Sequence, residues 1–405
     1  MIRASLLALA IAALVAAPSC APARNTCSDV HDRLKACGFP VAALDCTRID
    51  RSTEEALAER LDARGCAGVA YGDTDAVDPR VCTLAGWPCP VSPIPEPGPA
   101  APRYPLVLVS GIDGSPTFDW NPKIATASGA HHVQVLPWAT TKDRGTDLWQ
   151  SLVSLRSHLG GAKLNLVCYA VGGIDCRYVA SPGGLFKGDA AGYRDVVATV
   201  ASITTISTPH RGTRVAEAAL SALRSGAAAD LLQTLVGSSA TTAVPGDAAL
   251  SKTLDGLTLE ALEAFNRDVT DAPGVFYQSW AGVSHVLGKS SAASETSIRE
   301  HCTAPNGDLL FLRHKDTNDA MNELLWITAP FASTSRNDRG TVVSSPSDGM
   351  VSVESAKWGE FRGCIPADHY DVIGQIAHTT RDGLTGFDAP RFLRYVASGL
   401  AERGL

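Results

Sequence analysis

The segment LNLVCYAVGGIDCRYVA, at residues 164–180, determines the fold expected for this chain. It opens with a short apolar run from Leu164 to Val167, which is typical of a buried strand. Small residues and glycines follow at 170–173, and a helix-like pattern continues to Ala180. This order predicts a strand that turns abruptly into a helix.

A bend of this kind, with the pattern Gly-x-Ser-x-Gly, carries the nucleophile of many hydrolases. Small flanking residues let the strand and the helix approach each other, and the serine oxygen is lifted above the sheet. In this chain the five positions are occupied by Cys168, Tyr169, Ala170, Val171 and Gly172. The sequence therefore predicts a nucleophile elbow in which alanine stands at the nucleophile position.

Four further segments identify the family that the chain resembles. They are YPLVLVSGI at 104–112, STPHRGT at 207–213, DGMVSVESAKWG at 348–359 and DHYDVIGQ at 368–375. Together with the elbow, and in the same order, they resemble segments of the bacterial triacylglycerol lipases of the Pseudomonas and Burkholderia type. The resemblance implies an α/β-hydrolase fold, with a mostly parallel central sheet flanked by helices and a helical lid insertion at about 214–256.

Two partners of the missing nucleophile are present according to this resemblance. Asp348 matches the acid of the family and His369 matches the base, in the order that this fold uses. Such a pair can orient the imidazole and stabilise its protonated form, but Ala170 offers it no proton to remove. The resemblance also implies that the backbone N–H groups of Ile112 and Val171 form the oxyanion hole.

The resemblance further implies one structural calcium ion that steadies the histidine loop. The Asp371 carboxylate and the backbone carbonyl groups of Gln375 and Thr379 match three of its ligand positions. The fourth ligand would be an earlier acidic residue, either Asp316 or Asp319. Oxygen ligands of this kind suit calcium, so we expect a calcium site beside the base.

Neighbouring groups could replace the missing nucleophile. Cys168 is intrinsically more nucleophilic than serine, but its position two residues before the bend favours a side chain turned toward the helix. Ser110 and Ser115 offer hydroxyl groups in the oxyanion loop, although loop serines usually only form turns. A water molecule activated by His369 is a further route, which would support slow ester hydrolysis.

The chain has eleven cysteines. Removal of Cys20 by cleavage, or its lipid modification, leaves ten, an even number that fits disulfides in an oxidising compartment. Six of them fall between residues 24 and 90, which predicts a small module held by three disulfides. A zinc site is less favoured, because no Cys-x-x-Cys pair occurs. The six are Cys27, Cys37, Cys46, Cys66, Cys82 and Cys89. In the rest of the chain, Cys168 and Cys176 could form a bridge, which leaves Cys302 and Cys364 for a second one.

The N-terminal residues resemble a secretory signal peptide, since the apolar run at 4–17 is too short to span a bilayer. Cleavage near Ala23 competes with lipid modification of Cys20. Dense prolines further along predict an extended linker. The expected parts are a signal peptide at 1–23, a cysteine-rich module at 24–90, a linker at 91–103 and a lipase-like domain at 104–405. We expect a secreted, periplasmic or outer-membrane-associated protein.

The net charge of −7 and the lack of a basic patch argue against a nucleic-acid partner. Membrane contact is expected only through the lid or through a lipid anchor at Cys20. Three functions stay open: an exported pseudo-lipase that binds a lipid or an ester, an active carboxylic-ester hydrolase, and a binding or structural protein of the cell envelope. Apart from calcium, no cofactor is expected.

Overall fold

The computed structural model describes ten ranges of the chain. They are residues 26–36, 51–64, 94–95, 97–113, 119–225, 247–288, 291–304, 319–375, 382 and 385–405. The expected signal peptide, Ser115, Asp316 and Thr379 lie outside these ranges, as does most of the cysteine-rich segment.

A six-stranded parallel sheet forms the centre of the molecule, with the strand order β2-β1-β3-β4-β5-β8. Its strands are β1 (Leu106–Val109), β2 (His131–Val133), β3 (Leu164–Tyr169), β4 (Val200–Ile206), β5 (Phe276–Gly282) and β8 (Glu360–Ile365). A separate antiparallel pair consists of β6 (Thr334–Arg336) and β7 (Val342–Ser344). Parallel strands require crossovers, and helices supply them here.

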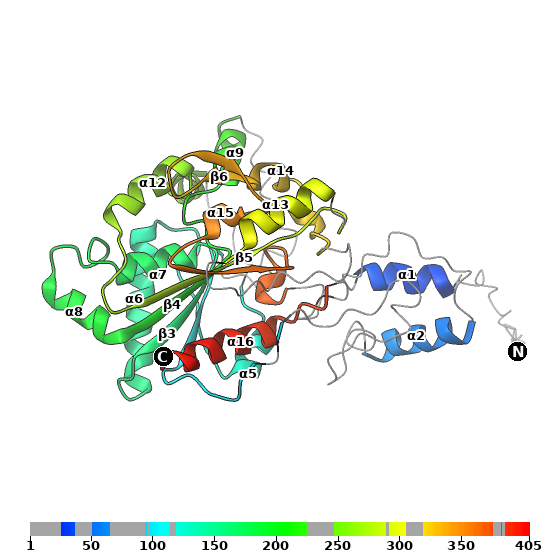
Figure 1. Cartoon of the computed structure of the whole chain (residues 1–405), viewed down its shortest axis with the longest axis horizontal. Coiled ribbons are helices and arrows are strands. Elements are labelled where there is room, and N and C mark those ends of the chain that lie inside the picture. Colours follow the sequence, from blue (N-terminus) through cyan, green and yellow to red (C-terminus); the bar gives the residue numbers. More distant parts are fainter. Residues whose placement is uncertain are drawn as a thin grey trace, which may run out of the picture.

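Helices cover both faces of the sheet (Figure 1). Among the described residues from 119 onward, the α-helices are α5 (Pro122–Ser128), α6 (Thr141–His158), α7 (Gly172–Ala180), α8 (Ala190–Thr199), α9 (Arg214–Arg224), α11 (Asp247–Asp255), α12 (Leu259–Asp268), α13 (Ala292–Cys302), α14 (Ala329–Ala332), α15 (Val353–Ala356) and α16 (Ala389–Glu402). The same part of the chain has two short 3-10 helices, η1 (Glu323–Leu325) and η2 (Asp371–Ile373).

Two apolar cores separate the sheet from these helices. Along β1, Leu108 packs with α5 and α16 on one face, whereas Val107 packs with α6 and α7 on the other. This alternation follows from the two-residue period of a strand. The expected architecture, a mostly parallel sheet flanked by helices, is confirmed.

Some boundaries differ from the sequence-based expectation. Residues 131–138 look strand-like, but β2 ends at Val133, because the Leu136 N–H donates to the Asp147 carboxylate and Pro137 has no N–H. In the expected lid, the structure describes α9 and α11 at its two ends. Residues 226–246 lie outside the described ranges.

Two helices of the cysteine-rich segment are described, α1 (Thr26–Ala36) and α2 (Arg51–Arg64), and they lie beside the main body (Figure 1). They pack through buried side chains that include Leu34 and Leu57. Cys27 is disulfide-bonded. The three-bridge module and its boundaries stay predictions, because the other cysteines lie outside the described residues. No helix in the described part is long and apolar enough to cross a membrane.

Candidate active site

The bend expected between strand and helix is present, with Ala170 at its apex. β3 ends at Tyr169, α7 begins at Gly172, and Ala170 has a φ of 48°. A left-handed backbone costs an L-residue about 1–2 kcal/mol, so surrounding contacts must hold it. They do so closely, because a Cβ atom on Gly172 would lie 2.3 Å from the Ser110 carbonyl oxygen. The chain therefore keeps the elbow backbone although no hydroxyl group stands on it.

A disulfide ties the two arms of this bend together. It joins Cys168 at the end of β3 to Cys176 in α7, and both residues are fully buried. The bridge consumes the thiol of Cys168, which removes this residue as a replacement nucleophile.

Asp348 and His369 lie together at the carboxyl edge of the sheet. The imidazole Nδ1 is 2.8 Å from Asp348 Oδ2, and the other carboxylate oxygen accepts hydrogen bonds from the backbone N–H groups of Met350 and Val351. The Tyr169 hydroxyl donates to the His369 carbonyl oxygen at 2.9 Å. Asp348 thus holds the His369 ring through Nδ1. No described residue occupies Nε2, and His369 and Ala170 line the same cavity.

The expected oxyanion donors lie beside the alanine. A Cβ atom on Gly111 would be 3.5 Å from the Cβ of Ala170, which places the loop against the elbow. Within the described residues, the N–H groups of Ile112 and Val171 donate to no acceptor. Val171 is buried and Ile112 is half-buried, so both N–H groups lie at the cavity with their hydrogen-bonding capacity unused by the described residues.

Arg144 holds the oxyanion loop in this orientation. Its guanidinium donates to the Gly111 carbonyl at 2.6 Å and pairs with Asp175 at 2.8 Å. The Gly111 carbonyl and the Ile112 N–H belong to one planar peptide, so they point in opposite directions. By binding the oxygen from behind, Arg144 turns the Ile112 N–H toward the cavity.

The Arg144–Asp175 pair was missed by the sequence analysis. Both side chains are fully buried, and burial raises the pKa of Asp175 against the opposing effect of Arg144. Nothing in the local pattern marks either residue, since they lie 31 positions apart on two helices. Two charges on helices that both pack on one face of the sheet are the only signal that could have suggested the pair.

Ser110 does not replace the nucleophile. It is fully buried and its hydroxyl donates to the Val133 carbonyl at 3.1 Å. His132 and Asp119 lie nearby, but Ser110 and Asp119 both approach the same ring nitrogen, Nε2 of His132. A catalytic triad requires the two partners on opposite nitrogens. This second serine–histidine–aspartate group is therefore a structural contact.

An apolar cavity of about 110 Å³ opens beside Ala170 and His369. Its walls come from the elbow, the oxyanion loop and the lid helices α9 and α11. The lining residues are Ile112, Asp113, Trp138, Tyr169, Ala170, Val171, Pro209, Thr213, Val215, Ala216, Ala219, Leu250, Leu254, Leu257, Met350, Val351, His369 and Tyr370. The cavity suits the acyl part of an ester.

Three buried aspartates meet behind the histidine loop. Carboxylate oxygens of Asp319, Asp368 and Asp371 lie within 4.8 Å of one another. Burial and repulsion from neighbouring carboxylates raise the pKa values of Asp319 and Asp371 well above the ordinary range. Burial, aided by the charge of Asp348 and opposed by backbone hydrogen bonds, raises the pKa of Asp368 to about 6. Such a set is costly without a cation, and its hard oxygen ligands fit calcium.

The set differs in part from the expected calcium ligands. Asp371 belongs to it, and so does Asp319, the alternative to Asp316. Asp368 was not expected. The Gln375 side chain donates to the Asp119 carbonyl at 2.6 Å, and a role for the Gln375 backbone carbonyl stays a prediction. Asp316 and Thr379 lie outside the described residues.

A second disulfide, Cys302–Cys364, joins α13 to β8 and so anchors the strand that leads to His369.

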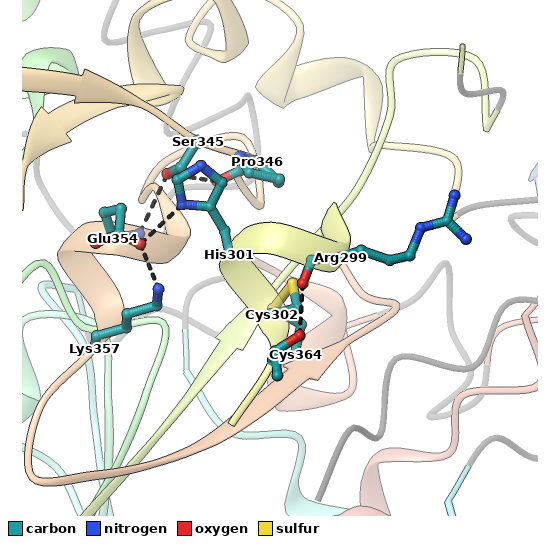
Figure 2. Close-up of a disulfide and its surroundings, with 9 residues drawn as sticks. Arg299, His301, Cys302, Ser345, Pro346, Glu354, Lys357 and Cys364 are labelled. Carbon is teal, nitrogen blue, oxygen red and sulfur yellow. Dashed lines mark hydrogen bonds and ion pairs between the residues drawn. A yellow bond between two sulfur atoms is a disulfide. The ribbon is translucent and has the colours of Figure 1, made fainter. Parts of the chain in front are cut away.

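Figure 2 shows the charged group beside this disulfide, which consists of His301, Glu354 and Lys357. Burial alone would raise the pKa of Glu354, but its contacts with His301 and Lys357 outweigh burial and hold the value at about 2.

Similarity to known proteins agrees with this site. No family model matches the chain. The chain is 31% identical to a triacylglycerol lipase of Vibrio cholerae over 224 residues. This alignment covers 47% of this chain and 67% of the Vibrio protein. A triacylglycerol lipase of Burkholderia plantarii is 32% identical over 130 residues, or 29% of this chain and 33% of that one.

Solved structures of lipases also align with the chain. The mature Bacillus licheniformis lipase has 19% identity and a TM-score of 0.43, with 70% of this chain and 90% of that chain covered. The Staphylococcus hyicus lipase has 16% identity and a TM-score of 0.41, with 75% and 97% covered. The identity to the Vibrio lipase over two thirds of its length establishes the relationship, and the chain belongs to the bacterial triacylglycerol lipase family.

Proposed function

We propose that this protein is an exported pseudo-lipase, which binds a lipid or an ester over Ala170 without forming an acyl-enzyme. The observation that carries the proposal is a complete site around a methyl group: the elbow, the Asp348–His369 pair and two unpaired N–H donors surround Ala170. Export is supported by the signal-like N-terminus and by the disulfides, which form in oxidising compartments.

The geometry supports binding without the covalent step. The N–H groups of Ile112 and Val171 would hold the carbonyl oxygen of an ester, and the apolar cavity would take its acyl chain. The carbonyl carbon would then face the methyl group of Ala170, which has no lone pair for attack. Loss of a triad nucleophile typically lowers the rate by about a millionfold.

Restoring the hydroxyl tests this proposal. We expect no turnover of p-nitrophenyl butyrate or palmitate by the native protein, and turnover at least a thousandfold above background by Ala170→Ser. The gain should disappear in the double variant Ala170→Ser/His369→Ala, because the new serine needs its base. Turnover by the native protein that is lost in His369→Ala would contradict the pseudo-lipase.

That contradicting result would favour a second candidate function, slow ester hydrolysis by an activated water. Its supporting observation is the His369 ring, in which Nδ1 is held by Asp348 and Nε2 has no described partner. A ring held in this way can act as a general base on a water molecule. The two candidates differ in the native protein alone, because only the second one turns over esters with Ala170 in place.

The proposal includes one structural calcium ion at Asp319, Asp368 and Asp371. When bound, the ion would neutralise the three carboxylates and stabilise the loop that carries His369. We expect a chelator to lower the melting temperature by about 5 °C and added calcium to restore it. Asp371→Asn should abolish this response, and exposed Asp268→Asn should retain it. Equal melting temperatures with chelator and with calcium would exclude the site.

A further inference from the structure

The cavity beside Ala170 is small for a lipid chain. Its volume of about 110 Å³ is below the roughly 150 Å³ of an engineered cavity that accommodates benzene. Leu250, Leu254 and Leu257 close it from the side of the lid, and Trp138 and Tyr169 close it from the side of the sheet. An acyl group of about four carbons fills this space.

Two backbone N–H groups determine which hydrogen-bonding group the ligand must carry. The N–H groups of Ile112 and Val171 have no acceptor among the described residues, and Arg144 fixes the first of them. A ligand that covers these donors without accepting from them leaves them unsatisfied, which is costly, so the preferred ligand carries an oxygen acceptor at this point. A hydrocarbon or an ether chain without a carbonyl oxygen would leave both donors unsatisfied.

The charges around the cavity then distinguish a neutral carbonyl group from a carboxylate. None of the described residues that line it is lysine or arginine. Asp113 is a fully buried part of the wall, and Asp348 lies directly behind His369. A carboxylate ligand would lose its hydration in an apolar cavity with two buried carboxylates nearby and no cation in the described lining, whereas a neutral ester loses far less.

Resting on the proposed function, we infer that the site selects a neutral carbonyl compound with a short acyl group, and that it discriminates against the corresponding free acid. The acyl chain fills the cavity, the carbonyl oxygen accepts from Ile112 and Val171, and the alcohol part extends toward the mouth. Asp113 is the acidic residue of the described lining, and its contribution to this selectivity is measured below. A short-chain ester therefore stays bound intact, and the acid that hydrolysis elsewhere would produce is rejected.

Four probes test the inference on the native protein, by ligand-observed NMR titration at pH 7.5 with calcium present. Ethyl butyrate is expected to bind at least tenfold more tightly than butyrate, and at least tenfold more tightly than ethyl butyl ether, which lacks the carbonyl group. Ethyl octanoate should bind within about threefold of ethyl butyrate. If the cavity admitted its four additional methylene groups, binding would be tighter by about a hundredfold or more.

Two variants and a control locate the selectivity. Asp113→Asn should strengthen butyrate binding at least threefold and change ethyl butyrate binding less than twofold. Leu254→Ala should strengthen ethyl octanoate binding at least tenfold, because the shorter side chain enlarges the cavity. Leu287→Ala, at an exposed leucine, should change neither. The four probes decide the question on the native protein even if a variant does not fold.

The outcomes separate this inference from the proposed function. Butyrate or the ether binding as tightly as ethyl butyrate would overturn the inference alone, as would a hundredfold gain for ethyl octanoate. Failure of all four probes to bind would overturn the proposed function as well.

Discussion

At the bend between β3 and α7, the backbone has the shape of a nucleophile elbow and alanine stands at its apex. At the loop after β8, both the backbone and the acid–base side chains are present. A disulfide anchors each region, Cys168–Cys176 at the bend and Cys302–Cys364 near the loop. The difference shows that packing and hydrogen bonds hold the backbone of the elbow although the side chain at its apex is a methyl group.

The largest expected effect tests what holds the bend side of the site. Arg144→Ala leaves the buried Asp175 carboxylate without its partner and frees the Gly111 carbonyl, so we expect the free energy of unfolding to fall by about 3–5 kcal/mol. Urea denaturation measures this. As a control, Lys187→Ala breaks the exposed pair with Asp268 and should cost less than about 1 kcal/mol. Similar small losses in both variants would mean that the pair does not hold the loop.

A smaller, pH-dependent effect is expected near the acid–base loop. The pKa of Glu354 is held at about 2, below its ordinary value of 4.5, so the folded state gains stability from its charge above pH 4.5. That gain is lost as the pH falls from 4.5 toward 2. We therefore expect Glu354→Gln to cost about 2 kcal/mol at pH 7, roughly half of that near pH 3, and little at pH 2.

Urea denaturation across this pH range measures the Glu354 effect, with Glu263→Gln as an exposed control. A cost for Glu354→Gln that stays constant with pH would refute the electrostatic explanation. Comparing the costs of Glu354→Gln and Arg144→Ala shows whether the region around α15 or the bend depends more on buried charge.

The smallest expected effect concerns the strain at the apex. Ala170→Gly relieves the left-handed backbone and should raise the free energy of unfolding by up to about 1 kcal/mol, net of the greater freedom of glycine in the unfolded chain. Ala198→Gly, at an exposed position in helix α8, should lower it by about 1 kcal/mol. Thermal denaturation of the two variants shows whether each substitution raises or lowers the stability. Destabilisation in both variants would show that the bend is not strained.

The sequence is informative where function requires a local pattern. The elbow follows from the spacing of small residues around Ala170, and the motifs around Asp348 and His369 correctly placed these two residues beside each other. Arg144 and Asp175 could not be foreseen, because their contact depends on how α6 and α7 pack on the sheet. Asp368 was missed for a related reason, since three carboxylates meet only after two distant loops have folded together.

The left-handed bend at Ala170 also has an evolutionary consequence. Every alanine codon becomes a serine codon by one change at its first base, so a single mutation would return a hydroxyl group to the apex. The backbone would be much harder to regain, because glycines such as Gly172 and Gly173 leave no room for a Cβ atom. The protein thus retains the part that is difficult to rebuild and lacks only the part that one base change would supply.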